Sequence, residues 1–223
     1  TESECLEHLK SYAKKISCFK SFIGQGYYNT MTPGVIERNI LENPGWYTQY
    51  TPYQAEISQG RLEALLNFQT IITELTGLPI ANASLLDEGT AAAEAMLMAH
   101  RIFHKENRKS TANEFIVCED TFSQTIAILE TRAEPLGIKV IKQAFDSIQV
   151  TEQTFGVFIQ YPASSGQIHH PELIQKQCDK AKFIIATDLF SCCLIKEPGQ
   201  FNADICVGTS QRFGVPIGFG GPH

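Results

Sequence analysis

Several features that mark other classes of protein are missing from this chain. The 223 residues have a net charge of −6, and no cluster of lysines and arginines stands out, which argues against a nucleic-acid partner. No apolar run is long enough to span a bilayer, so no membrane partner is expected. The polar, charged start at Thr1 does not resemble a signal peptide.

Paired cysteines and metal-ligand patterns are missing too. The seven cysteines include no Cys-x-x-Cys pair, which predicts reduced thiols of a cytoplasmic protein, packed as small apolar side chains. His169 and His170 are neighbours without a helix-spaced third ligand. We therefore expect a loop pair there and no metal site.

The N-terminal quarter is expected to be a helix followed by an extended arm. Thr1 to Lys15 has helical apolar spacing and a capping box formed by Thr1 and Glu4. Phe19 to Tyr53 is rich in Gly, Pro, Asn and Tyr and predicts irregular structure. A helix follows within Thr51 to Thr76, starting either at the Thr51 capping box or after Gly60. Its predicted buried face comprises Leu62, Leu65, Leu66, Gln69, Ile72 and Leu75.

The rest of the chain alternates between helical and strand patterns. Such alternation predicts an α/β fold, a mostly parallel sheet covered by helices, with a ligand crevice beyond the carboxyl ends of its strands. The expected helices are Asp87 to His104, Thr121 to Glu134 and Pro171 to Lys182. The expected strands are Phe115 to Cys118, Ile138 to Ile141, Gly156 to Tyr161, Phe183 to Thr187 and Ala203 to Val207.

The glycine-rich stretch after the last predicted strand resembles the lysine loop of fold-type I pyridoxal-phosphate (PLP) enzymes, but it contains no lysine. Gln211 and Arg212 stand there instead, and neither an amide nor a guanidinium can form an imine with the cofactor aldehyde. Two other features of such a site are present. Gly89 and Thr90 open a helix where a phosphate would bind, and Asp188 follows a strand where it would pair with the pyridinium nitrogen.

Three long segments, 24–33, 44–61 and 211–222, closely resemble the glycine decarboxylase P-protein family. The resemblance covers nearly the whole chain and is with the N-terminal half of that protein, which in many bacteria is a separate subunit 1. It implies a PLP-transferase-like large domain at 55–223, incomplete at its C-terminus and without a small domain, preceded by an arm at 1–54. The chain would then be a truncated form.

The same resemblance implies a function within a complex. Subunit 1 would support PLP-dependent glycine decarboxylation and transfer of the aminomethyl group to the lipoylated H-protein. The cofactor lysine would belong to subunit 2, in a heterotetramer with subunit 1. This chain would bind no PLP covalently and would be inactive alone.

The candidate cofactor residues also have structural interpretations. Asp87 and Glu88 favour the start of a helix and would repel a phosphate there. Asp188 could be a turn residue. We therefore expect Gly89, Thr90, Asp188 and Gln211 to be vestigial, and Gln211 and Arg212 to hold loop carbonyls or the partner.

The loop of Tyr27, Tyr28, Asn29 and Thr30 is the best candidate for a direct role. It offers two phenols, an amide and a hydroxyl next to glycines, as recognition loops often do. The resemblance implies that it reaches the active site of the catalytic half. The alternative is that both tyrosines are packing anchors.

Two other functions stay open. One is a PLP aminotransferase or desulfurase with its lysine elsewhere; the other is a non-catalytic scaffold. The lysines in the second half of the chain do not follow a strand with a Ser or His before them, which disfavours the first. They include Lys139, Lys142, Lys180, Lys182 and Lys196.

Overall fold

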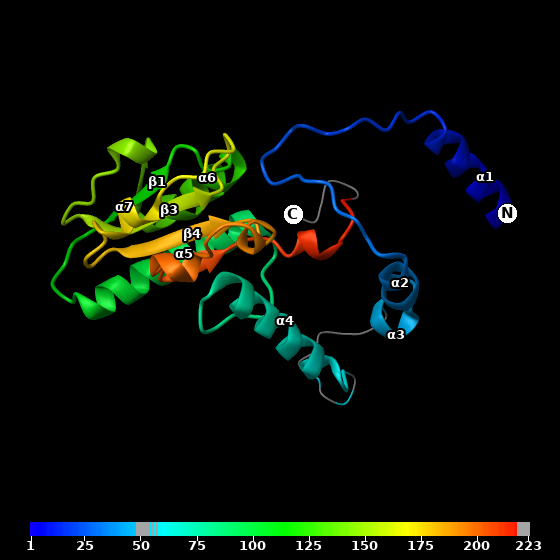
Figure 1. The fold of residues 1–223 in the computed structure, drawn as a ribbon, viewed down its shortest axis with the longest axis horizontal. Helices are drawn as coiled ribbons and strands as arrows, with labels where there is room; N and C mark the ends of the chain where they lie inside the picture. The colour runs from blue at the N-terminus through cyan, green and yellow to red at the C-terminus, as the bar shows by residue number, and fades with distance from the viewer. Residues whose placement is uncertain (48–53, 55, 57, 218–223) are drawn as a thin grey trace.

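The centre of the molecule is a parallel sheet of five strands in the order β2-β1-β3-β4-β5 (Figure 1). The computed structural model describes residues 1–47, 54, 56 and 58–217. The predicted alternation of helices and strands is confirmed. The strands are β1 (Glu114–Cys118), β2 (Lys139–Gln143), β3 (Thr154–Tyr161), β4 (Lys182–Thr187) and β5 (Ile205–Val207).

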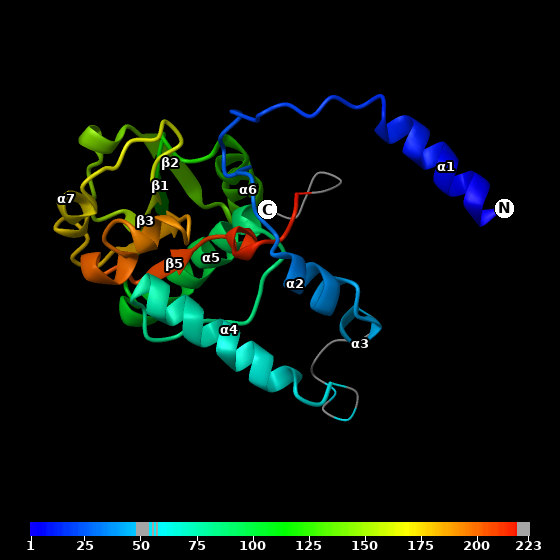
Figure 2. The same cartoon turned by 45° about the vertical axis from the view of Figure 1, so that its right-hand side comes forward.

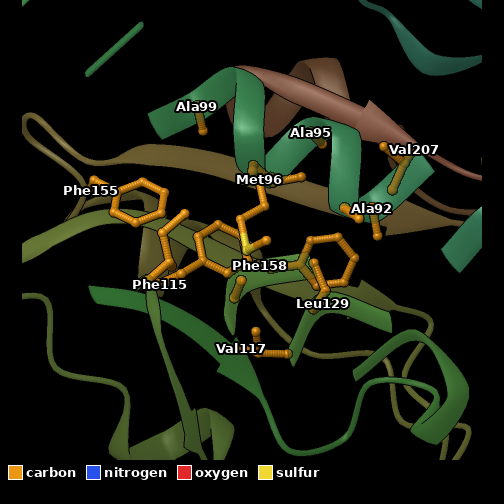
Figure 3. Packing of buried hydrophobic residues seen from close by; sticks show 14 of the residues in the cluster. Ala92, Ala95, Met96, Ala99, Phe115, Val117, Leu129, Phe155, Phe158 and Val207 are labelled. Carbon is orange, nitrogen blue, oxygen red and sulfur yellow. The ribbon is translucent and has the colours of Figure 1, made fainter. Parts of the chain in front are cut away.

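Both faces of this sheet are covered. All eight residues of β3 are buried, as expected for a central strand of a parallel sheet. On one face, α5 (Glu88–Glu106) and α6 (Ser123–Ala133) pack against side chains such as Phe115 and Phe158 (Figure 3). On the other face lie α7 (Pro171–Gln175) and the 3-10 turns η3 (Phe145–Ser147) and η5 (Pro198–Phe201).

The alanines of α5 let this helix lie close to the sheet. Ala92, Ala93 and Ala99 are fully buried around Met96, and small side chains keep the helix near the strands without leaving voids. Asp87 caps the helix: its carboxylate accepts the Thr90 N–H at 2.7 Å. The predicted helix is confirmed.

The N-terminal helix lies apart from the sheet (Figures 1 and 2). The helix α1 (Glu2–Ala13) has the predicted capping box of Thr1 and Glu4 and no buried residue. The predicted irregular stretch is wrong in part, because it contains α2 (Gly34–Ile36), the π-helical η1 (Glu37–Leu41) and α3 (Pro44–Tyr47). The first two are contiguous over 34–41 and the third is a single turn, and the Gly and Pro content concealed them.

Two predicted helices differ from the structure. The helix α4 (Arg61–Thr76) begins after Gly60, whose φ of +78° breaks the helix, and Leu62 and Leu66 on its expected buried face are exposed. The alternative start at Thr51 lies outside the described residues. The helix α7 ends at Gln175 and does not reach Lys182.

The exposure of the cysteines and the character of the helices bear on two further predictions. All seven cysteines are free, but Cys5, Cys18 and Cys193 are exposed, so the predicted packing of every thiol in the interior is wrong. Within residues 1–47 and 58–217, no helix has the length and apolar character needed to cross a bilayer.

Candidate functional site

The candidate site lies beyond the carboxyl ends of the strands. Asp188 follows β4, Gly208 and Thr209 follow β5, and the N-terminus of α5 points to the same end. Ligand crevices of open α/β sheets form at this end. The loop after β5 forms the 3-10 turn η6 (Gln211–Phe213). At the position where the resemblance expects a lysine, the Gln211 side chain is buried, and its Nε2 has no hydrogen-bond partner among the described residues.

Glycines let this loop pass close to its neighbours. A Cβ on Gly208 would lie 2.4 Å from the Thr187 carbonyl oxygen, so any side chain there would push β5 away from β4. Gly214 has a φ of +116°, and a Cβ there would lie 2.9 Å from the Met31 carbonyl oxygen. The loop after β5 therefore touches both the sheet and the N-terminal arm.

The Arg212 side chain connects three segments at this end of the sheet. Its Nε lies 3.4 Å from Asp188 Oδ1, and one terminal nitrogen donates to the Asn29 carbonyl oxygen at 2.9 Å. The guanidinium carbon lies 5.1 Å from the Tyr28 ring centroid and 4.8 Å from that of Phe190. The prediction that Arg212 holds loop carbonyls agrees with the Asn29 contact.

Further hydrogen bonds attach the N-terminal arm to the sheet domain before and after the Arg212 contact. Thr30 Oγ1 donates to the Val215 carbonyl oxygen at 2.9 Å, and Thr32 Oγ1 to that of Gly214 at 2.5 Å. At the start of α6, the Ser123 N–H donates to Gln25 Oε1 at 3.1 Å. We call residues Gly24–Thr32 the docked segment.

The loop of residues 27–30, which was predicted to reach an active site, is thus the middle of the docked segment. Tyr28, Asn29 and Thr30 contact the chain's own domain, and Tyr27 is half-buried with its N–H bonded to the Gly24 carbonyl at 3.0 Å. Burial, and next the charge of Asp188, raise the pKa of the Tyr28 phenol. The phenol is therefore neutral at pH 7.

Glu88 is a buried carboxyl group that the sequence analysis placed at the helix start only. It is 5% exposed, and its Oε1 has no hydrogen-bond partner in the described part of the chain. Burial raises its pKa from 4.5 to about 7; a hydrogen bond from Gln160 opposes the rise, and the charge of Asp188 adds to it. The sequence contained a pattern that predicts this burial, because Glu88 has helical spacing with Ala91, Ala92 and Ala95, all on the buried face of α5.

Gly89 and Thr90 are occupied by structural contacts. The Thr90 N–H is bonded to Asp87, and a Cβ on Gly89 would lie 2.4 Å from Ile128 Cδ1. Glycine therefore allows α5 to pack closely on α6. The structure brings Asp188 and the Tyr28 loop together, while Gly89 and Thr90 serve the start of α5.

Comparison with known proteins defines the family. The model of the family described as "Glycine cleavage system P-protein" matches residues 1–223. The chain belongs to the glycine cleavage system P-protein family. The glycine dehydrogenase (decarboxylating) of Thermosynechococcus vestitus and the mitochondrial enzyme of Pisum sativum are each 54% identical to it. Both alignments cover the whole chain, but the chain spans only 23% and 21% of the two relatives.

Solved structures agree with this assignment. A crystal structure of glycine decarboxylase (P-protein) of the glycine cleavage system, in an inhibitor-bound form, superposes with a TM-score of 0.87 at 32% identity. It matches all of this chain, which covers 51% of that one. A structure of SspA in complex with cysteine has a TM-score of 0.62 at 15% identity and shows the fold alone. The predicted PLP-transferase-like α/β fold is confirmed.

The residues of this P-protein segment do not fit a bound PLP. The cavity between Glu88, Asp188 and Arg212 has a volume of about 40 Å³, which is room for a water molecule and far below a cofactor site. A larger cleft of about 710 Å³ lies beside α4, α5 and β5. Its lining includes one cationic side chain, Arg101, against the carboxyls of Asp87, Glu88, Glu94 and Asp204, and this balance disfavours a phosphate.

Proposed function

We propose that this chain is the part of a P-protein that supports glycine decarboxylation without carrying the cofactor. It would be subunit 1 of glycine dehydrogenase (decarboxylating). A lysine-bearing subunit 2 would complete the heterotetramer, and the H-protein lipoyl group would receive the aminomethyl group. PLP in the partner would supply the electron sink for decarboxylation. This chain's residues would shape the wall of that site and the interface around it.

The loop after β5 carries this proposal. Gln211 is buried where the resemblance expects the lysine, and Arg212 contacts Asp188 and Asn29. Membership of the P-protein family supports the activity, and the names of the relatives, glycine dehydrogenase (decarboxylating), support the substrate. Relatives occur in bacteria and in mitochondria; we propose the cytoplasm for a bacterial form.

The lysines of this chain argue against a PLP enzyme of another class. Lys182 begins β4, at the amino end of the sheet, and pairs with Glu106 at 2.8 Å. Lys142 pairs with Glu130 at 3.0 Å. Neither lines the cavity at the strand ends, where an aminotransferase or desulfurase would need its amine.

Covalent labelling tests the cofactor part of the proposal. The purified chain is incubated with PLP and reduced with borohydride, and its mass is measured. We expect no stoichiometric label on any single lysine, because the strand-end site offers no amine. Full labelling of one lysine would favour the aminotransferase or desulfurase alternative.

Substitution of the two tyrosines tests the role of the docked segment in the reaction. Tyr28→Phe keeps the ring that stacks on Arg212 and removes only the hydroxyl. If the phenol bonds a charged intermediate, glycine-dependent CO2 exchange by the complete complex should fall roughly ten- to hundredfold. Tyr27→Phe is the matched control for the neighbouring position. Wild-type exchange in both variants would favour packing anchors and weaken the proposed role of the loop.

A further inference from the structure

The surroundings of the Arg212 guanidinium have the chemistry of a binding site for a flat cation. Two aromatic rings flank it, a carboxylate faces it and a backbone carbonyl accepts a hydrogen bond from it. These groups come from separate segments: Tyr28 and Asn29 from the arm, and Asp188 and Phe190 from the turn after β4. Arg212 itself comes from η6 after β5.

An ion pair alone does not explain this arrangement. The distance of 3.4 Å from Arg212 to Asp188 is long for a strong charge-assisted hydrogen bond, and the buried Arg212 Nε has no hydrogen-bond partner among the described residues. Stacking distinguishes arginine from lysine, because a planar, weakly hydrated cation attracts aromatic faces while it donates in its own plane. The aromatic rings and the Asn29 carbonyl therefore help to hold the guanidinium in place.

We propose that Asp188, Tyr28, Phe190 and the Asn29 carbonyl form a binding site for a planar organic cation, which Arg212 fills from within the chain. Occupancy of the site by the guanidinium holds the docked segment against the strand ends. The site thus offers an aspartate and aromatic surroundings suited to a flat cation, and a side chain of the same chain occupies it.

The contacts around Arg212 explain why one side chain can control the whole segment. Thr30 and Thr32 bond to Val215 and Gly214, which directly follow η6. Any shift of η6 therefore moves the acceptors of both threonines. Before residue 28, the contact between Gln25 and Ser123 anchors the docked segment to α6. Loss of the Arg212 side chain should therefore detach residues 28–32 from the domain first.

Chemical rescue of an Arg212→Ala variant tests the proposal in the whole P-protein. Hydrogen–deuterium exchange of peptides covering residues 24–32 should be roughly ten- to hundredfold faster than in the unmodified protein. Millimolar ethylguanidinium should restore the slow exchange, because it supplies the planar cation. Ethylamine at the same concentration should not. Arg132→Ala, which removes an arginine paired with Glu94 on α5, is the matched control and should leave residues 24–32 unchanged.

Three results would overturn the proposal: unchanged exchange in Arg212→Ala, equal rescue by ethylamine, or no rescue by ethylguanidinium in a folded variant. If Arg212→Ala does not fold, Tyr28→Leu removes one face of the site and leaves the arginine in place. It should also accelerate exchange at residues 24–32. Unchanged hydrogen exchange at residues 24–32 in that variant would show that the Tyr28 ring does not help to hold the segment, and would overturn the proposal. None of these measurements depends on enzymatic activity, so they are independent of the proposed function.

Discussion

The N-terminal arm and the sheet domain use the same kinds of side chain in opposite ways. Phe22 in the arm is 90% exposed, whereas Phe158 in β3 is fully buried. The apolar residues of α1, such as Leu9, also face solvent. Exposed apolar groups that lie close together are typical of surfaces that contact other proteins. The comparison shows that the sheet domain has its own core, while the arm lacks one.

The docked segment is where the two regions meet. Here the arm gains contacts with the loop after β5 and with the start of α6. The rest of the arm before it contributes no buried residue. Stability in the two regions should therefore respond differently to the same substitution.

The largest expected effect is that of a phenylalanine removed from the sheet. Phe158→Ala leaves a cavity between β3 and α5 and should lower the free energy of unfolding by about 3–5 kcal/mol. Phe22→Ala is the matched substitution in the arm and should change it by less than about 0.5 kcal/mol. Denaturant unfolding of both variants makes the comparison. A loss of similar size in Phe22→Ala would show that the arm shares the core.

The buried carboxyl of Glu88 should give the sheet domain a pH dependence that the arm lacks. Its pKa is raised from 4.5 to about 7, so the folded state binds the proton more tightly than the unfolded state. The stability contributed by this group is present in full below pH 4.5 and is lost as the pH rises toward 7. The expected loss at pH 8 is on the order of 3 kcal/mol.

Glu88→Gln should remove that pH dependence. The amide cannot ionise, and it can donate to Gln160 Oε1, which has no hydrogen-bond partner within the described residues. We expect the variant to be more stable than the unmodified chain at pH 8 and similar at pH 5, measured by denaturant unfolding at both values. The charged and titratable groups that influence the Glu88 site are Asp188, Tyr28, Arg212 and Cys206. A pH profile unchanged by the substitution would mean that Glu88 is not the source of the pH dependence.

The sequence predicted the sheet domain well, because the residues whose pattern indicates strands and helices there are also the residues that pack in its core. The β-branched and aromatic runs lie on strands buried on both sides, and the cap at Asp87 lies where α5 begins. Prediction was poorer for α4 and the arm. The helical apolar spacing of α4 predicted that Leu62 and Leu66 are buried, but no element of the described chain covers them. Periodicity shows which residues share a face, and tertiary packing decides whether that face is covered.

The candidate site was predictable as a set of strand-end residues but not as a set of contacts. The position of Asp188 after β4 follows from the strand pattern. Its pairing with Arg212 requires two loops to meet, and the stacking on Tyr28 requires an arm distant in sequence to fold back. Glu88 carried a usable signal, since its spacing on α5 matched the buried alanines. The sequence analysis considered Glu88 only as a favourable charge at the helix start, so its burial was not predicted.

Removal of one hydroxyl from the docked segment should have a smaller effect, confined to the arm. Thr30→Val keeps the shape of the side chain and removes the hydrogen bond to the Val215 carbonyl. Because this contact joins the arm to the loop after β5, we expect the free energy of local opening to fall by about 1 kcal/mol. Hydrogen exchange should therefore quicken roughly fivefold at residues 24–32, while β1, β3 and β4 keep their rates. Thr30→Ser retains the hydroxyl and is the control. Faster exchange in the strands as well would mean that the arm and the sheet open together, and that the contrast between them holds for burial but not for stability.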